Sequence, residues 1–363
     1  MDIQKIASNF LVPGTYLSAN PIGSGHINET YITSFNNNGV VVRYILRKIN
    51  KFVFNNPKVV IKNSVNISAH IRQKLINQGV TDVERRTMTF FVTHENKYYH
   101  KDQNGDYWCM ILFFEDAYTI DFVQTKEQSY KSAKAFGNFQ RLIIDANVSD
   151  YQETIPDFHN LPKRIEAFDI AVEKNPINRL QNINNELIAI NNNRVLGREY
   201  TGLMSKNLPV RLTHNDTKIN NVMLDKKTDE GLCVIDLDTV MPGTILNDFG
   251  DMVRTSTCTV AEDEKNISKV HIQLDIFEAM TKGYLEPLTG IISKLEIRNL
   301  VFGAKLIVFE QAIRFLTDYL LGDKYYSTLY NDHNLVRAQN QFALLKSIQR
   351  NEAGMKEIVK KYA

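Results

Sequence analysis

Two segments in the second half of the chain combine side chains that suit phosphoryl transfer. Residues 213–221 read Thr-His-Asn-Asp-Thr-Lys-Ile-Asn-Asn, and Asp236 follows them at the end of an expected strand. Phosphoryl transfer needs a carboxylate that orients the acceptor hydroxyl, and oxygen ligands that hold Mg²⁺ on the phosphates. Asp216 therefore fits the base, and Asn221 and Asp236 fit the metal ligands. Each residue alone is also a common turn or cap residue, so the full pattern carries the prediction.

The neighbouring residues predict how this pattern is positioned. Two short apolar strands separated by a polar turn are expected within residues 222–235, and such a hairpin returns Asp236 to the side of the loop. His214 is expected to orient the loop and not to carry a proton. Thr213 and Asn215 are expected to be bystanders.

A glycine-rich segment near the N-terminus is a candidate phosphate-binding loop. Residues 22–28 read Ile-Gly-Ser-Gly-His-Ile-Asn and precede a strand that starts at Thr30. Glycines let the backbone approach phosphates closely, and the backbone N–H groups then contact them. Gly-Ser-Gly is also an ordinary turn, so this segment gains weight from the basic strand that follows it. The candidate nucleotide contacts are Gly23, Ser24, Gly25 and Asn28.

The basic strand reads Tyr-Ile-Leu-Arg-Lys-Ile-Asn over residues 44–50. Side chains alternate between the two faces of a strand, so only one of Arg47 and Lys48 reaches a nucleotide. We favour Lys48 as the phosphate-binding cation and expect Arg47 to be a surface charge.

Periodicity separates a strand-rich first part from a helical second part. Strands are expected at residues 30–33, 40–49, 87–93 and 107–114, and one helix between Asn56–Pro57 and Gly79. After residue 115, apolar residues recur at helical spacing, as over 125–144 and 161–174. We therefore expect an α+β, bilobal protein-kinase-like fold. Its β-rich nucleotide-binding lobe spans residues 1–115, and its mainly helical catalytic and substrate-binding lobe spans residues 116–363.

The composition indicates the class of protein. A formal net charge of +2 argues against a dedicated nucleic-acid surface. No apolar run is long enough for a membrane span, and the first residues lack the pattern of a secretory signal. The three cysteines are scattered beside apolar residues, which favours buried free thiols in a reducing compartment. We expect a cytoplasmic protein with no membrane or nucleic-acid partner.

Together these segments resemble the aminoglycoside-phosphotransferase and choline-kinase superfamily, and most closely its N-acetylhexosamine 1-kinase branch. The resemblance spans nearly the whole chain. Its motifs are residues 23–28, 44–50, 155–159, 213–221, 234–243, 247–251, 262–264 and 314–319.

The resemblance implies a reaction and its cofactors. ATP would lie between the lobes with its adenine against the hinge at residues 110–114, where Phe113 is the candidate contact. Asp216 would accept the proton of a sugar's anomeric hydroxyl, while Asn221 and Asp236 would hold Mg²⁺. The implied substrate is N-acetylglucosamine or N-acetylgalactosamine, and the product is the sugar 1-phosphate. Asp238 would serve either the metal or the sugar.

A sugar site must offer several hydrogen-bonding groups. The candidates are His159 beside Phe158, Arg254, and a group on one expected helix, namely Arg314, Asp318 and Tyr319. Arg314 and Asp318 are four residues apart and share a helix face, so an ion pair between them is the alternative. For His159 a structural role is the alternative, and it is the favoured one.

Two departures from kinase-like patterns leave alternatives open. No acidic residue occurs between Glu29 and Asp82, so the usual helix glutamate is missing and Lys62 occupies its expected position. Cys109 stands where the family resemblance implies an arginine. An aminoglycoside, choline or amino-alcohol kinase keeps the same fold, and the acidic residues 262–264 would suit a cationic acceptor, although they also fit a solvated turn. A degenerate, non-catalytic kinase fold is the non-enzyme alternative, and a monomer or a homodimer is expected.

Overall fold

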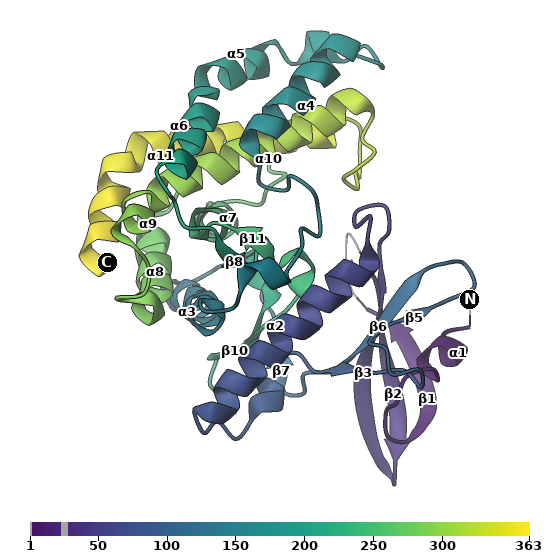
Figure 1. Cartoon of the computed structure of the whole chain (residues 1–363). Coiled ribbons are helices and arrows are strands. Elements are labelled where there is room, and N and C mark those ends of the chain that lie inside the picture. The colour runs from purple at the N-terminus through teal and green to yellow at the C-terminus, as the bar shows by residue number, and fades with distance from the viewer. Residues whose placement is uncertain (1, 23–27) are drawn as a thin grey trace.

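The computed structural model describes residues 2–22 and 28–363 of the chain. A β-rich part and a helical part lie side by side, with one long helix between them (Figure 1), which confirms the expected fold class. The strands are β1 (Thr15–Pro21), β2 (Glu29–Asn37), β3 (Val40–Ile49), β4 (Phe90–Phe91), β5 (His100–Lys101), β6 (Tyr107–Leu112), β7 (Ala117–Tyr118), β8 (Arg211–Thr213), β9 (Val222–Asp225), β10 (Gly231–Val234) and β11 (Met241–Gly243). The helices are α1 (Ile3–Ala7), α2 (Pro57–Asn77), α3 (Lys126–Ile143), α4 (Leu161–Lys174), α5 (Asn184–Asn193), α6 (Val195–Ser205), α7 (Ile245–Ser256), α8 (Leu274–Leu285), α9 (Lys294–Arg298), α10 (Leu300–Leu321) and α11 (His333–Tyr362).

The first part is built on an antiparallel sheet with the strand order β1-β2-β3-β6-β4, and β5 also pairs with β6. The expected strand at residues 87–93 is mostly wrong, since only Phe90 and Phe91 pair with β6. Thr93 instead forms an isolated bridge with Phe10, because the chain turns away from the sheet there.

The two faces of β3 pack against different cores. Tyr44 and Leu46 face a small core with Trp108 and Met110, whereas Ile49 joins the large core that contains α2 and the helical part. Arg47 alternates with Leu46 and therefore lies on the same side as Ile49. The packing of β3 thus decides which basic side chain turns toward the rest of the molecule.

Helix α2 starts at Pro57 and is followed by Gly79, whose φ of 76° ends the helix in the left-handed region. The predicted apolar stripe of this helix, including Val60, Ile67 and Ile71, is buried. Asn63 donates from its amide to the carbonyl of Val240 at 3.0 Å. Helix α2 therefore contacts the segment that follows Asp236 as well as the sheet.

The expected hairpin is present as β9 and β10, which pair antiparallel. A second pair, β8 with β11, frames the residues between them. The backbone N–H of Ile235 donates to the carbonyl of Asn221 at 2.9 Å. These pairings place both segments of the phosphoryl-transfer pattern next to each other.

Helices α7 and α10 approach closely at two glycines. A Cβ on Gly303 would overlap the carbonyl oxygen of Leu246, and a Cβ on Gly250 would overlap the carbonyl oxygen of Gly303. The position of α7 relative to α10 therefore depends on the absence of these side-chain atoms. No helix among the described residues combines the length and the apolar character needed to cross a membrane.

We expect Gly303→Ala to destabilise the protein by about 1–3 kcal/mol, because the extra methyl group has no room between α7 and α10. Gly354→Ala is the matched control, since nothing lies within 4 Å of the added Cβ. That substitution lies inside α11 and should stabilise by about 0.5–1 kcal/mol. Urea unfolding followed by circular dichroism measures both. Equal stability of the two variants would contradict this account of the helix crossing.

Candidate active site

The loop between β8 and β9 is fixed by a buried carboxylate on α7. Asp248 accepts from the backbone N–H of His214 at 2.9 Å and from that of Asn215 at 2.7 Å. Its own backbone carbonyl accepts from the Thr217 hydroxyl at 2.6 Å. Burial raises the pKa of Asp248, although the two N–H donors and the nearby His214 lower it. Asp248 lies within motif 247–251, but its role as the anchor of this loop was not predicted.

Asn215 is the most heavily anchored residue of the loop. Its backbone has a φ of 64°, a left-handed conformation that asparagine tolerates better than most residues. Its side-chain amide donates to the carbonyls of Thr213 and Thr239 at 3.1 and 2.9 Å. Its carbonyl contacts Nε2 of His159 at 3.0 Å. The expectation that Asn215 is a bystander is therefore wrong, because it sets the direction in which Asp216 leaves the loop.

His214 is buried and holds the loop against the following strand. Its Nε2 contacts the carbonyl of Ile235 at 2.9 Å, and the rings of Phe136 and Phe139 pack edge-on against it. These contacts agree with the predicted orienting role of His214.

The carboxylate of Asp216 is surrounded by positive charge. Burial by itself raises its pKa, but Lys218, His214 and Arg254 outweigh that effect and bring the pKa below the ordinary aspartate value. Lys218 Nζ lies 3.4 Å from Oδ1 of Asp216, and this ion pair raises the pKa of Lys218. Asp216 is therefore ionised at neutral pH. Lys218 was missed by the sequence analysis, although it lies inside the pattern two residues after the base.

Asn221 lies next to Asp216. Its amide nitrogen donates to the Asp216 carbonyl at 2.9 Å and is 3.4 Å from Oδ2 of the same residue. This orientation turns the amide nitrogen toward Asp216 and directs the amide oxygen, the acceptor atom that a hard cation would need, away from these contacts.

Asp236 and Asp238 meet at one guanidinium. Nη1 of Arg47 contacts Asp236 at 3.1 Å, and Nη2 contacts Asp238. Asn28 donates to the second oxygen of Asp238 at 2.7 Å. Asp236 has a left-handed backbone conformation, and residues 237–239 after it form a 3₁₀ turn instead of continuing the strand. The turn, and not strand alternation, brings the two carboxylates together.

The expectation that Arg47 is a surface charge is wrong, because its side chain is only 12% exposed and pairs with Asp236 and Asp238. Lys48 lies on the opposite face of β3, where it pairs with Glu29 and sits 5.7 Å from the centre of the Trp108 ring. Arg47 is the basic residue on the side of Asp236. Lys62 of α2 is exposed. In protein kinases a glutamate on the first-lobe helix pairs with a strand lysine. Here the basic strand residue is Arg47, and the carboxylates of Asp236 and Asp238 pair with it instead.

The other predicted nucleotide contacts have different outcomes. Gly23, Ser24 and Gly25 lie outside the described residues. Phe113 follows β6, and the guanidinium of Arg43 lies 4.3 Å from the centre of its ring.

Arg254 on α7 forms a buried charge network beside the base. Its Nε donates to Asp251 at 2.8 Å, and its Nη1 contacts Glu262. These two carboxylates raise the pKa of Arg254 although burial lowers it. Arg254, Lys218 and Glu262 line a cavity of about 210 Å³. Residues 262–263 form a turn at the surface, as one of the two alternatives expected, and the partly exposed carboxylate of Glu262 also pairs with Arg254.

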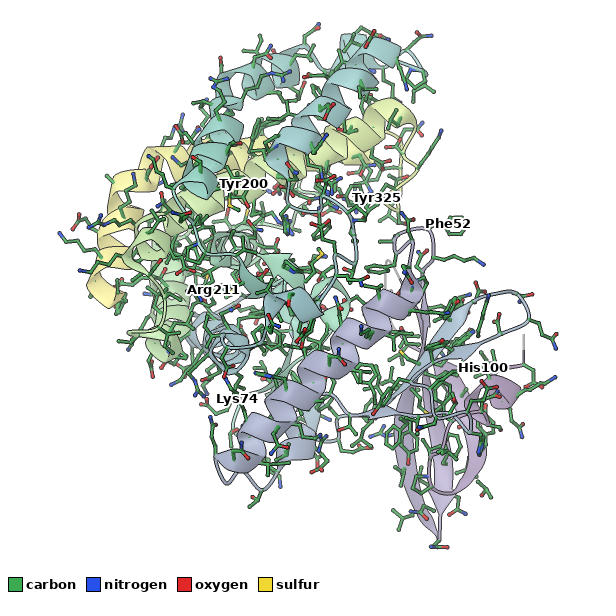
Figure 2. The ribbon with its side chains drawn as sticks, in the orientation of Figure 1. Phe52, Lys74, His100, Tyr200, Arg211 and Tyr325 are labelled. Atoms are coloured by element: carbon green, nitrogen blue, oxygen red, sulfur yellow. The ribbon has the colours of Figure 1, made fainter. Side chains whose placement is uncertain are left out.

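Arg314 on α10 lies among aromatic rings. Its guanidinium carbon is 4.8 Å from the centre of the Phe158 ring and 5.8 and 5.7 Å from those of Tyr325 and Tyr326. Figure 2 shows Tyr325 on the loop that follows α10, on the side turned toward the N-terminal end of α2. Burial lowers the pKa of Arg314, and so does repulsion from Arg254, but Tyr326, Tyr325 and Glu310 outweigh both and raise it.

The expectation that Asp318 and Tyr319 bind substrate is wrong. Asp318 accepts hydrogen bonds from the backbone N–H groups of Lys324, Tyr325 and Tyr326 and from the Asn334 amide. Tyr319 is fully buried, and its hydroxyl donates to Asp332 at 2.9 Å. Asp318 therefore fixes the loop that carries Tyr325, and the alternative of an ion pair with Arg314 is not observed.

A metal ion would find a limited ligand set here. The described residues contain no group of three or more His, Cys, Asp and Glu side chains that could hold an ion. They do offer the carboxylates of Asp236 and Asp238 together with the amide oxygen of Asn221. This set fits Mg²⁺ that is bound partly by phosphates, because such ions take only one or two protein carboxylates.

Comparison with protein families agrees with this geometry. Residues 18–266 match the model of the phosphotransferase enzyme family, which is more than half of the chain. The chain belongs to this family. The matched residues include Arg47, Asp216, Asn221, Asp236 and Arg254, so every element of the site except the α10 residues lies within the family region of this phosphotransferase.

Solved structures share its fold over nearly the full length. An aminoglycoside phosphotransferase from Alicyclobacillus acidocaldarius is similar at 12% identity and a TM-score of 0.62, with 99% of this chain and 97% of that chain covered. A microcompartment-associated aminopropanol kinase has 12% identity, a TM-score of 0.59 and 98% coverage of both chains. The spectinomycin phosphotransferase APH(9)-Ia, in complex with ADP and spectinomycin, has 15% identity, a TM-score of 0.51 and coverage of 96% and 93%.

We expect Asp248→Asn to lower both stability and turnover of the phosphotransferase. The amide retains one acceptor oxygen, so one of the two N–H groups of His214 and Asn215 loses its partner, at a cost of about 1–3 kcal/mol. Asp229→Asn in the exposed β9–β10 turn is the control and should change neither quantity. Thermal unfolding and the rate of ADP release measure the two effects. Wild-type stability of Asp248→Asn would show that the loop does not depend on this anchor.

Proposed function

We propose that this phosphotransferase transfers the γ-phosphoryl group of ATP to the anomeric hydroxyl of an N-acetylhexosamine, N-acetylglucosamine or N-acetylgalactosamine, and releases the sugar 1-phosphate. Asp216 accepts the proton of the acceptor hydroxyl. Its lowered pKa supports this role, because an ionised carboxylate is ready to accept the hydrogen bond that orients the hydroxyl. Lys218, paired with Asp216, lines the adjacent cavity.

The ligand set at Asn221, Asp236 and Asp238 supports binding of Mg²⁺ together with ATP. The metal would neutralise the charge of the β- and γ-phosphates during transfer. Arg47 supplies the positive charge beside these carboxylates and is the residue that we assign to the phosphates. The hinge at residues 110–114 and the glycine-rich segment remain the proposed adenine and phosphate contacts. The ADP complex of the similar spectinomycin phosphotransferase supports a nucleotide site in this fold.

The observation that carries the acceptor assignment is the charge around Arg314. Its guanidinium donates to Gln311 at 3.2 Å, while Arg164 donates to the carbonyl of Phe158 at 2.9 Å. No carboxylate of the described residues forms an ion pair with either guanidinium. Two arginines without ion-pair partners repel a cationic acceptor, whereas their N–H groups and the rings around Arg314 suit the hydroxyl, carbonyl and apolar faces of a neutral sugar.

An amino-alcohol or aminoglycoside acceptor is the second candidate. The aminopropanol kinase and the aminoglycoside phosphotransferase among the similar structures favour it. Glu262, an acidic residue that lines the cavity with Lys218, already pairs with Arg254. For this reason we rank the neutral sugar first.

A coupled ADP-release screen over hexoses, N-acetylhexosamines, aminoglycosides and amino alcohols tests the proposal, with phosphorus NMR of the product. We expect turnover with an N-acetylhexosamine and an anomeric phosphate signal. Asp216→Asn should lower turnover by about 10³-fold or more, because base and orientation are lost together, while Mg·ADP affinity stays within about twofold. Turnover of amines alone would replace the sugar assignment by the second candidate.

We expect Arg47→Met to weaken binding of Mg·ADP by about tenfold or more, equivalent to about 1.4 kcal/mol, because the phosphates lose their cation. Lys48→Met is the matched control from the other face of β3 and should leave the affinity within about twofold. Isothermal titration calorimetry measures both without an acceptor. The opposite ranking of the two variants would return the nucleotide contact to Lys48.

A further inference from the structure

His159 connects α10 to the residue that precedes the base. It lies in the segment before α4, with its side chain 8% exposed. Nδ1 lies 2.8 Å from Oε1 of Glu310, and Nε2 lies 3.0 Å from the carbonyl oxygen of Asn215. Both partners accept hydrogen bonds. A neutral imidazole has only one N–H and would leave one of these two contacts without a hydrogen.

The second carboxylate oxygen of Glu310 leaves His159 as the hydrogen-bonding partner of this carboxylate. Oε2 is buried and has no hydrogen-bond partner among the described residues. The carboxylate of Glu310 therefore depends on His159 for its hydrogen bond. A buried carboxylate is stabilised by a positively charged partner, and His159 is the side chain that contacts Glu310 Oε1. A doubly protonated ring supplies that charge and gives each of its two contacts a hydrogen.

We propose that His159 acts as a doubly protonated positioning residue, which holds the carbonyl of Asn215 with one N–H and Glu310 with the other and thereby fixes the direction of Asp216. The proposal concerns the same active site and rests on Asp216 being the base. Asn215 has a left-handed backbone, its N–H group binds Asp248, and its side-chain amide binds Thr239. Its backbone carbonyl is the polar group that neither of these contacts uses, and His159 binds it. Loss of the Nε2 hydrogen bond would free the peptide that carries Asp216.

The charges that face this pair come from several elements. Glu310 and Arg314 lie on α10, Asp248 on α7, Arg164 on α4 and Tyr200 on α6. Burial lowers the pKa of His159 and so does Arg314, but the charge and hydrogen bond of Glu310 and the Asn215 carbonyl outweigh them, and the pKa is raised. Asp248 interacts favourably with the protonated ring. Glu310 also acts on two further groups. Its negative charge favours the charged form of Arg164, and, in addition to the larger effect of burial, it raises the pKa of Tyr200.

The raised pKa of His159 determines how its contacts change with pH. The pKa of His159 is higher in the folded protein than the ordinary value of about 6.5. The Nε2 contact is therefore complete below about pH 6.5 and is lost as the pH rises through the folded pKa. Turnover should fall on the alkaline side with the titration of His159.

The first test is NMR of the full-length protein, which needs no acceptor. Long-range ¹H–¹⁵N spectra of the histidine rings are recorded between pH 6 and 10, and the His159→Gln spectrum assigns the signals of residue 159. We expect both nitrogens to carry a proton at pH 7 and one to lose it at higher pH. Glu310→Gln removes the negative charge, so its His159 should already be neutral at pH 7. A neutral ring in the wild type at pH 7 overturns the proposal.

The second test is the pH profile of turnover, measured as ADP release with the acceptor that the screen identifies. His159→Gln should lower kcat by about 10- to 100-fold, since a displacement of about 1 Å at the reacting groups has an effect of this size. It should also remove the alkaline limb, while Mg·ADP affinity is unchanged. Glu310→Gln should move that limb to lower pH.

The control is His70→Gln, because His70 also pairs with a carboxylate, that of Asp145 at 3.0 Å, but does so on the outer side of α2. It should leave kcat and the pH profile as in the wild type. An unshifted alkaline limb in Glu310→Gln contradicts the proposal even if kcat falls, because a purely structural role lowers kcat without moving the profile. If the NMR result holds and no acceptor is phosphorylated, the proposed function fails and the protonation of His159 stands.

Discussion

The saturation of Asn215 is the constraint on which the catalytic geometry depends. Its N–H group, its carbonyl and its side-chain amide bind α7, His159 and the β8–β11 region. Because every polar group of this buried residue is used, the peptide before Asp216 has a single orientation, even though its backbone adopts the less favourable left-handed conformation. Among the described residues, the contacts that hold the peptide before Asp216 come from α7, from His159 and from the β8–β11 region.

The nucleotide side depends on a different interaction, which joins the two parts of the molecule. Arg47 from the sheet is held between Asp236 and Asp238, and the buried Asp238 needs that charge because burying an unpaired ion is unfavourable by several kcal/mol. Helix α2 contributes neutral groups to this region through Asn63 and Ser64, which donate to the carbonyls of Val240 and Leu237. The absence of an acidic residue from this helix is thus compatible with a paired basic residue on β3.

On the proposed acceptor side, the two arginines differ in whether a carboxylate pairs with them. Arg254 is neutralised by Asp251 and Glu262, and Arg314 is surrounded by rings and has no ion-pair partner among the described residues. Asp318, which was expected to face the substrate, instead orders the loop that carries Tyr325. The shape of this region therefore derives from α10 and from the loop that α10 itself fixes.

Local patterns in the sequence determined the fold class, the long helix, the β9–β10 hairpin, and the placement of Asn221 beside both Asp216 and the residue before Asp236, because each is set by periodicity or by short fixed spacing. The sequence could not determine which face of β3 is turned inward, since alternation gives two equivalent faces until the cores on each side are packed. It also left open the partners of His159, Asp248 and Asp318, which come from segments distant in the chain. Only the tertiary structure decided that Arg47 meets Asp236 and that Asn215 is held from three sides, because these contacts arise where separate elements are packed together.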